Sequence, residues 1–192
     1  MVEQQFVRHI ESRVELIPEI GRYIQTGGGK RVRPALLLMC ARLGGYRGER
    51  ATLYASVVEF IHTATLLHDD VVDESEKRRG RPTANLLWDN KSSVLVGDYL
   101  FARSFQLMTE TNNMRVLAIL ANASATIAEG EVLQLTAAQN LATDEGIYLQ
   151  VVRGKTAALF SAATQVGGVI AAAPDAQVQA LFDYGDALGI AF

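Results

Sequence analysis

The sequence predicts an all-α protein, and three observations carry that prediction. Apolar residues recur at helical rather than alternating spacing through the long segments. Ala, Leu, Glu, Gln and Arg, which all favour helices, are abundant. Only four prolines occur, and each falls near an apparent element boundary. With 192 residues, 49% of them hydrophobic, we expect one domain over residues 1–192 with a buried core.

Glycine and proline positions set the first boundaries. A first helix is expected over residues 2–26, where three consecutive glycines, 27–29, end it. Pro34 then opens a second helix, because proline in the first turn loses no hydrogen bond that the helix needs. This helix is expected to end near Leu43, where two further glycines follow.

The rest of the chain alternates between long helical segments and polar connections. A third helix is expected over residues 50–73, and the polar, basic stretch 74–90 reads as a loop. Asp144 and Asp175 are expected to act as N-caps of the last two helices. The last four helices are expected over residues 92–109, 114–135, 144–170 and 175–192.

Composition narrows the class of protein. A net charge of −3 provides no global basic field, so we expect no nucleic-acid partner. The single cysteine, Cys40, lies in an apolar run and predicts a buried free thiol, which fits a reducing cytoplasm. Residues 1–13 lack an apolar signal core, and no stretch of about 18 uninterrupted apolar residues occurs. We therefore expect a cytoplasmic protein without a membrane anchor.

The segment LLHDDVVD, residues 66–73, carries the strongest functional signal. On a helix Asp69 and Asp73 share a face, and Asp70 lies about 100° around from Asp69. Three carboxylates at the end of an apolar helix repel one another unless a cation neutralises them. Oxygen ligands without histidine or thiol partners suit Mg²⁺, which also shares the oxygens of a bound phosphate. The alternative is a solvated acidic helix end.

Two basic loops accompany the aspartates. In GGGKRVRP, residues 27–34, glycines let backbone N–H groups approach an anion closely, and Lys30 and Arg33 are the expected diphosphate donors. Arg78 and Arg79 follow the aspartates and present planar forks that match phosphate oxygens. A solvated or salt-bridged loop is the alternative for each.

Helical spacing places further polar side chains. His62 lies seven residues before Asp69 on nearly the same face, although a satisfied core histidine has the same pattern. The segment GKT, residues 154–156, resembles the end of a P-loop, but a leucine stands where that motif needs its first glycine and no strand precedes it. We therefore expect Lys155 and Thr156 within a helix, directed into a cavity, with an exposed lysine as the alternative.

Together these motifs describe a metal-bridged diphosphate pocket beside a cationic pocket, and they resemble the trans-isoprenyl diphosphate synthase family. GGGKRVRP resembles the family's isopentenyl diphosphate site, and DDVVDESEKRRGRPTAN resembles its first aspartate-rich motif. GDYLFARSF, EGEVLQL and GKTAALF follow in matching order and spacing. EFIHTATLLHDDVVDES and IAEGEVLQL look closest to bacterial octaprenyl and decaprenyl diphosphate synthases, which make the ubiquinone side chain. The implied fold is an antiparallel helical bundle around a central apolar cavity.

The resemblance implies a prenyltransferase that condenses isopentenyl diphosphate with an allylic diphosphate such as farnesyl diphosphate. It further implies Mg²⁺ as cofactor and a homodimer as the assembly. Isopentenyl diphosphate would be held by Lys30, Arg33, His62 and Arg79. The magnesium on the allylic diphosphate would be held by Asp69, Asp70 and Asp73, with phosphate contacts from Arg78, Lys155 and Thr156. Weaker matches in the same cavity are Asp98 and Gln134.

The product length is expected to depend on small residues below the aspartates. Thr65 lies one turn before Asp69 on almost the same face, and Ala64 lies beside it. Short-chain members of the family carry bulky aromatics there, which block a growing tail. Ala64 and Thr65 therefore predict a long product, in the octaprenyl to decaprenyl range, although ordinary helix packing also uses small residues.

One departure from the family pattern concerns the C-terminal part. The family's second aspartate-rich motif follows a segment like YGDALGIAF, and this chain ends at Phe192 just before it. We therefore expect part of the metal site and the C-terminal helices to be missing from the chain. The alternatives are a geranylgeranyl or other medium-chain synthase and a non-catalytic subunit of a heteromeric synthase, although such subunits usually lose aspartates of the first cluster. The missing glycine and strand argue against a nucleotide-binding protein, and a terpene cyclase would not need the Lys30 and Arg33 pocket.

Overall fold

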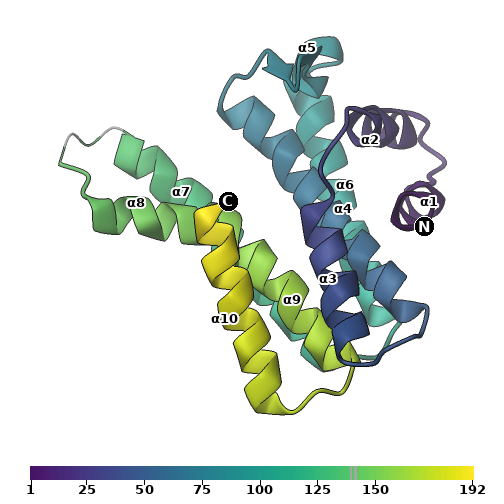
Figure 1. The fold of residues 1–192 in the computed structure, drawn as a ribbon. Coiled ribbons are helices and arrows are strands. Elements are labelled where there is room, and N and C mark those ends of the chain that lie inside the picture. Colours follow the sequence, from purple (N-terminus) through teal and green to yellow (C-terminus); the bar gives the residue numbers. More distant parts are fainter. Residues whose placement is uncertain (139, 141) are drawn as a thin grey trace.

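The protein is a bundle of helices in a computed structural model that describes residues 1–138, 140 and 142–192 (Figure 1). The all-α prediction is confirmed, since the described sheet is limited to one hairpin of two-residue strands. In chain order the elements are α1 (Val2–His9), α2 (Leu16–Thr26), α3 (Val32–Leu43), α4 (Arg50–Val72), β1 (Lys77–Arg78), β2 (Arg81–Pro82), α5 (Ala84–Leu87), α6 (Asn90–Thr109), α7 (Met114–Ala138), α8 (Glu145–Val152), η1 (Arg153–Ala157), α9 (Ala158–Ile170) and α10 (Asp175–Ala191).

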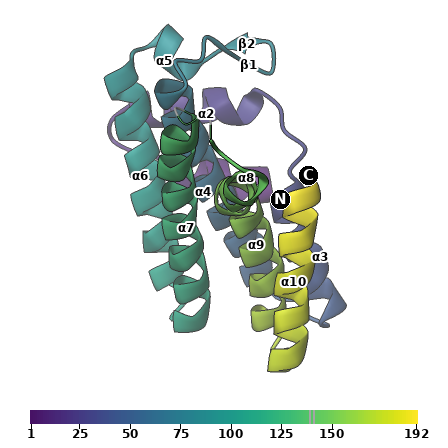
Figure 2. The ribbon, with the colours of Figure 1, turned by 90° about the vertical axis from the view of Figure 1, so that its left-hand side faces the viewer.

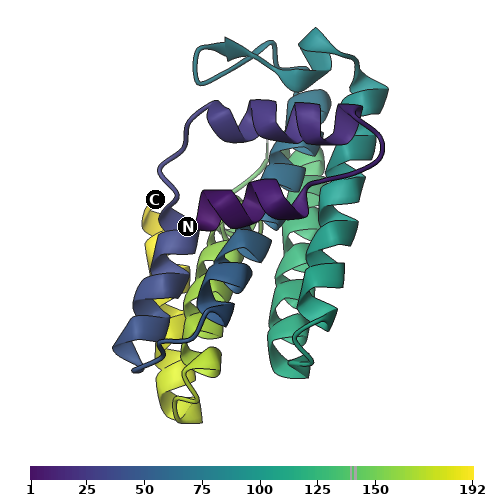
Figure 3. The same ribbon diagram turned by 90° about the vertical axis from the view of Figure 1, so that its right-hand side faces the viewer.

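The long helices stand side by side, and the two N-terminal helices lie across them (Figures 2 and 3). Helix α4 packs against α3 and α6, while α9 packs against α3, α7 and α10. These helices enclose an apolar core, and α1 joins it because Phe6 stacks on Phe60 of α4 with 4.3 Å between the ring centroids. The bundle therefore brings the C-terminal end of α4 close to segments that follow it by up to 86 residues.

The single helix expected over residues 2–26 is wrong, because residues 10–15 separate α1 from α2. Both helices bury apolar side chains in the same core, so the chain has to fold back between them. Ile10 ends α1 fully buried, and a Cβ on Gly21 of α2 would overlap its side chain. The break thus results from tertiary packing, which overrides helical propensity.

The loop expected over residues 74–90 contains more structure than the sequence indicated. A hairpin pairs β1 with β2, and its two turn residues, Arg79 and Gly80, have φ values of 53° and 79°. Positive φ at both central positions is typical of the two-residue turns that match the twist of a hairpin. The one-turn helix α5 then precedes α6.

The helix expected over residues 144–170 is continuous, but its middle is a π-helical segment, η1. The predicted N-cap Asp144 is confirmed, since its Oδ1 accepts from the backbone N–H of Ile147 at 2.8 Å. The predicted N-cap Asp175 is wrong. Pro174 occupies the cap position, and Asp175, the first residue of α10, accepts instead from Arg115 at 2.8 Å.

Helix α7 has a composition unusual for the described helices. By length and apolar content alone it is long enough to cross a membrane, with a mean hydropathy of 1.4 over its most apolar window. A core helix of a bundle passes the same test, and α7 packs against α6, α9 and η1. We therefore assign α7 to the bundle.

Helices α7 and η1 approach each other through glycine. A Cβ on Gly130 would lie 2.7 Å from the backbone nitrogen of Lys155 and 2.9 Å from the Cα of Gly154. Backbone atoms on both helices leave no side chain that could move aside. Only glycine fits this crossing. The close approach places Lys155 beside Glu131, the residue that follows Gly130.

Gly130→Ala is therefore expected to destabilise the protein. Alanine favours a helix over glycine by about 1 kcal/mol, but overpacking against fixed backbone costs about 1–3 kcal/mol, so the net free energy of unfolding should fall. Urea denaturation measures the change. As a matched control, Ala128→Leu on an exposed turn of the same helix should stay within about 0.5 kcal/mol of the wild type. Equal stability of Gly130→Ala and wild type would contradict the close approach.

Candidate active site

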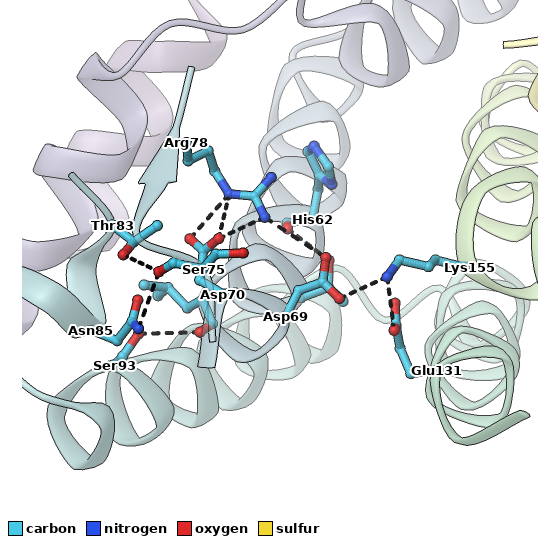
Figure 4. Close-up of polar contacts among 12 residues, drawn as sticks. His62, Asp69, Asp70, Ser75, Arg78, Thr83, Asn85, Ser93, Glu131 and Lys155 are labelled. Atoms are coloured by element: carbon cyan, nitrogen blue, oxygen red, sulfur yellow. Dashed lines mark hydrogen bonds and ion pairs between the residues drawn. The ribbon is translucent and has the colours of Figure 1, made fainter. Parts of the chain in front are cut away.

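The acidic end of α4 is tied to the hairpin by one arginine (Figure 4). The Asp70 side chain is 1% exposed and that of Asp69 is 14% exposed. Arg78 donates from Nε to both carboxylate oxygens of Asp70, at 2.9 and 3.1 Å, and its terminal nitrogen lies 2.8 Å from Asp70 Oδ1. The same nitrogen lies 3.7 Å from Asp69. A buried carboxylate needs such a partner, because without one its charge would be strongly destabilising.

Local hydrogen bonds hold the hairpin in the position that allows this pairing. The Ser75 N–H donates to the carbonyl of Asp70 at 2.9 Å, so the chain turns tightly after α4. Ser75 in turn offers its carbonyl to the Thr83 hydroxyl at 2.6 Å, which closes the base of the hairpin (Figure 4). Tyr23 of α2 donates to the Pro82 carbonyl at 2.7 Å. Arg78 therefore reaches the aspartates from a braced loop.

A lysine contacts the aspartate cluster from the opposite side. Lys155 Nζ donates to Asp69 at 2.8 Å and to Glu131 of α7 at 3.0 Å (Figure 4). Burial alone would lower the pKa of Lys155, but its bonds to these two carboxylates outweigh burial, and the pKa is raised. Burial raises the pKa of Glu131, and the nearby Asp69 adds to that rise. Lys155 remains a cation shared by two carboxylates.

The π-helical segment η1 carries both residues that the sequence placed in a cavity, Lys155 and Thr156. A π-turn widens the helix by one residue and thereby changes which side chains face a neighbour, and such turns are frequent at functional sites. Lys155 reaches the acidic cluster, whereas Thr156 lines the basic cavity described next. The sequence pattern offers no signal for η1.

A cavity of about 630 Å³ opens beside the acidic cluster and is rich in cations. Its basic lining residues are Lys30, Arg31, Arg33, Arg78 and Arg79, against the single carboxylate Glu59. Within the described part of the chain, Lys30, Arg33 and Arg79 make no ion pair with a carboxylate. This excess of positive charge, partly shielded from water, favours an anionic ligand.

Arg33 and His62 lie together in this cavity. Arg33 packs its guanidinium 4.5 Å from the centre of the Phe160 ring, and burial lowers its pKa to about 10, which leaves it charged at neutral pH. Its NH1 lies 3.4 Å from His62 Nε2. Burial first, and then Arg33 and the neighbouring arginines, hold the pKa of His62 well below its ordinary value. His62 is therefore neutral and accepts from Arg33.

The structure separates the residues expected at the site into three groups. The acidic cluster brings together Asp69, Asp70, Arg78 and Lys155, and the cavity brings together Lys30, Arg33, His62, Arg79 and Thr156. The remaining ones join neither group. Asp73 is exposed just beyond α4, and the carboxylate of Asp98 on α6 lies 3.2 Å from the Nε2 atom of His68 on α4. Gln134 is half-buried one turn after Glu131.

Sequence reasoning missed three polar residues of the site, namely Arg31, Glu59 and Glu131. Glu131 falls within the segment EGEVLQL, residues 129–135. Its position directly after Gly130 was the available signal, because a glycine inside a helix often marks a close helix crossing. Arg31 stood between the two cations that were singled out. Glu59 lies three residues before His62, so the two side chains neighbour each other on α4, and this proximity was the available signal.

The donor chemistry at the acidic cluster fits Mg²⁺. All candidate ligands are carboxylates, as a hard cation requires, and two of them, Asp69 and Asp73, are one helical turn apart. Among the described residues no three acidic, histidine or cysteine side chains already converge on one point. Asp69 and Asp70 instead point at Arg78 and Lys155.

Comparison with known proteins gives consistent matches. A family model described as polyprenyl synthetase matches residues 14–192. Octaprenyl diphosphate synthase of Haemophilus influenzae is 47% identical over 191 residues, which cover 100% of this chain and 58% of that protein. A crystal structure of a decaprenyl diphosphate synthase from Rhodobacter capsulatus superposes with a TM-score of 0.97 at 72% identity, over 99% of this chain and 59% of that chain.

A further structure contains ligands of interest. Polyprenyl synthase from Caulobacter crescentus, complexed with calcium and isoprenyl diphosphate, matches with a TM-score of 0.95 at 49% identity, over 98% of this chain and 57% of that chain. The fold is the all-α fold of isoprenoid synthases. The chain belongs to the polyprenyl synthetase family. It spans just under three fifths of the length of these relatives.

His62 makes the stability of the protein sensitive to mild acid. The unfolded chain takes up a proton on this imidazole near the ordinary pKa of 6.5, whereas the folded protein does not until well below it. The free energy of unfolding should therefore fall as pH drops below about 6.5. His62→Asn should flatten this slope between about pH 6.5 and pH 5 in urea denaturation. A variant curve parallel to that of the wild type would show that His62 is not held neutral.

Proposed function

We propose that the protein is a trans-polyprenyl diphosphate synthase, which condenses isopentenyl diphosphate with an allylic diphosphate such as farnesyl diphosphate. The proposed product is a long-chain trans-polyprenyl diphosphate for the ubiquinone side chain. The observation that carries the proposal is the pair of adjacent clusters, one of carboxylates with two cations and one of cations around a cavity. Two diphosphates need two such sites, and relatives that carry octaprenyl and decaprenyl synthase names support the reading.

The allylic diphosphate is assigned to the acidic cluster. Asp69, Asp70 and Asp73 would hold Mg²⁺, while Arg78 and Lys155 would turn from their carboxylates to the phosphate oxygens. When bound, the metal supplies Lewis-acid neutralisation of the charge that develops on the departing diphosphate. The two cations add hydrogen-bond donors aimed at the same charge.

Isopentenyl diphosphate is assigned to the basic cavity. Lys30, Arg33 and Arg79 supply positive charge, and Arg33 is held in place by Phe160 and His62. His62, being neutral, adds a polar contact without a further charge. Thr156 offers a hydroxyl at the same cavity, next to the lysine of the acidic cluster. The two diphosphates would then lie on either side of Arg78.

The proposed reaction breaks the allylic carbon–oxygen bond and forms a carbon–carbon bond. The double bond of isopentenyl diphosphate supplies the electron pair, and the proton then lost is taken up by the released diphosphate. Arg78 and Lys155 stabilise the leaving group, while Lys30 and Arg33 orient the second substrate. Water has to be excluded from the allylic cation, and the apolar helices around the site serve that purpose.

A homodimer and a cytoplasmic location belong to the same proposal. Both rest on the family resemblance and on the sequence features already described. Light scattering of the full-length protein tests the assembly, and a monomer at micromolar concentration would refute it.

Product sizing tests the function itself. The full-length protein is incubated with radiolabelled isopentenyl diphosphate, farnesyl diphosphate and Mg²⁺, and products are separated by thin-layer chromatography. Long polyprenyl products support the proposal. Geranylgeranyl diphosphate as the end product would favour the alternative of a medium-chain synthase. A geranylgeranyl diphosphate synthase from Saccharolobus solfataricus, 35% identical to this chain, is a relative with that activity in its name. No incorporation with any allylic primer would favour a non-catalytic subunit.

Asp69→Asn should lower kcat/KM by at least about 100-fold, because the variant loses a metal ligand and the carboxylate that orients Lys155. Glu129→Gln removes an exposed carboxylate from α7 and is the matched control, expected to keep wild-type activity. Initial rates of label incorporation measure both. Similar losses in the two variants would point to general charge effects rather than to a site at Asp69.

Thr65→Phe should shorten the product. Thr65 is partly exposed and lies one turn before Asp69, whereas Ala64 is fully buried in the core, so a phenylalanine at 65 is tolerated better than at 64. Chromatography of the products measures chain length at equal protein and substrate. Thr65→Val replaces the hydroxyl by a methyl group at nearly constant size and shape, and should leave the length unchanged. An unaltered product distribution in Thr65→Phe would reject the role of this position.

A further inference from the structure

Arg31 differs from the other cations of the glycine-rich loop because its side chain forms a short ion pair and a hydrogen bond within the protein. Its NH1 donates to Glu59 Oε1 at 2.7 Å and its NH2 donates to the carbonyl of Gln25 at 2.7 Å. Its Nε lies 3.5 Å from a carboxylate oxygen of Glu3. These contacts join the loop to α4, to the end of α2 and to α1.

The backbone at Arg31 is as unusual as its side chain. Arg31 has φ 49°, in the left-handed region, directly before the first residue of α3. Non-glycine residues adopt this conformation only where other contacts enforce it. A Cβ on Gly29 would lie 2.6 Å from Arg31 NH1 and 2.8 Å from Arg79 NH1, so two guanidinium groups close over the glycine. The side-chain contacts of Arg31 therefore accompany a specific loop conformation.

Glu59 is the unexpected member of the basic cavity. It is 4% exposed, and it is the one acidic residue in a described cavity lining that includes five lysine and arginine residues. Burial raises its pKa, and Arg31, Arg33 and Arg79 oppose that rise. A carboxylate at this place repels an anionic ligand by Coulomb's law. Its presence calls for a structural function that outweighs this repulsion.

We propose that Arg31 and Glu59 form a positioning pair, which fixes the glycine-rich loop so that Lys30 and Arg33 face the diphosphate. On this view Arg31 acts through the loop, because Glu59 and the Gln25 carbonyl each hold one of its terminal nitrogens. The inference rests on the proposed function for the identity of the ligand, isopentenyl diphosphate. It names residues outside the set that would contact that ligand.

The sign of one substitution separates this proposal from simple electrostatics. Glu59→Gln removes a negative charge from an anion site, so electrostatics alone predicts tighter binding of a diphosphate. The positioning pair predicts weaker binding, because Arg31 loses its charged partner and the loop loses its anchor. Glu3→Gln removes the exposed carboxylate that also approaches Arg31 and serves as the matched control.

The experiment uses the full-length protein and initial rates with isopentenyl diphosphate, farnesyl diphosphate and Mg²⁺. For Glu59→Gln we expect KM for isopentenyl diphosphate to rise at least about tenfold, with KM for the allylic substrate unchanged and kcat within about twofold. Glu3→Gln should behave as wild type. Arg31→Lys, which keeps the charge but only one donor group, should show a smaller rise in the same constant. A lower or unchanged KM in Glu59→Gln would overturn the proposal.

Titration with inorganic pyrophosphate, without metal, separates this inference from the proposed function. If the wild type makes no prenyl product, the function fails, but weaker pyrophosphate binding in Glu59→Gln than in Glu3→Gln still supports the pair. Equal binding in those two variants overturns it. Circular dichroism melting verifies folding. Should Glu59→Gln not fold, Arg31→Lys decides: wild-type pyrophosphate binding by that variant refutes the pair, and weakened binding supports it.

Discussion

Charge compensation at the C-terminal end of α4 is the constraint on which the rest of the site depends. Asp70 is buried and Asp69 nearly so, and an unpaired carboxylate at such a place costs several kcal/mol. Arg78 and Lys155 meet this need from opposite sides. Both come from the irregular parts of the fold, a tight hairpin and a π-helical segment. The departures from regular helix thus occur where cations have to reach the aspartates.

The cations around the two clusters differ in how they are already engaged. Arg78 and Lys155 are bound to carboxylates, so a ligand at the acidic cluster has to exchange partners with them. In the described part of the chain, Lys30 and Arg33 form no ion pair, so an anion in the cavity meets them directly. Arg31 lines the same cavity as Lys30 and Arg33, but it is paired with the carboxylate of Glu59. The two adjacent sites therefore differ in whether their cations are already paired with carboxylates.

The sequence predicted the class of fold, the long helices and most of the two clusters, because apolar spacing and carboxylate spacing are local properties. It did not predict the break between α1 and α2, which arises from burial of Phe6 and Ile10 in a shared core. It gave no sign of η1 or of Glu131 as the partner of Lys155, since both depend on how α7 crosses at Gly130. Asp98 was matched by motif, yet its exposed side chain lies beside His68 rather than at either cluster.

The central claim is that two diphosphates bind side by side, one at the carboxylates of α4 and one at the cations of the glycine-rich loop. A crystal structure of the full-length protein with Mg²⁺, isopentenyl diphosphate and a non-reactive allylic diphosphate analogue tests it most directly. We predict metal and one diphosphate at Asp69 and Asp70, with Lys155 turned to phosphate, and the second diphosphate within hydrogen-bond distance of Lys30 and Arg33. Ligands bound elsewhere, with Arg78 and Lys155 still paired to the aspartates, would contradict the account.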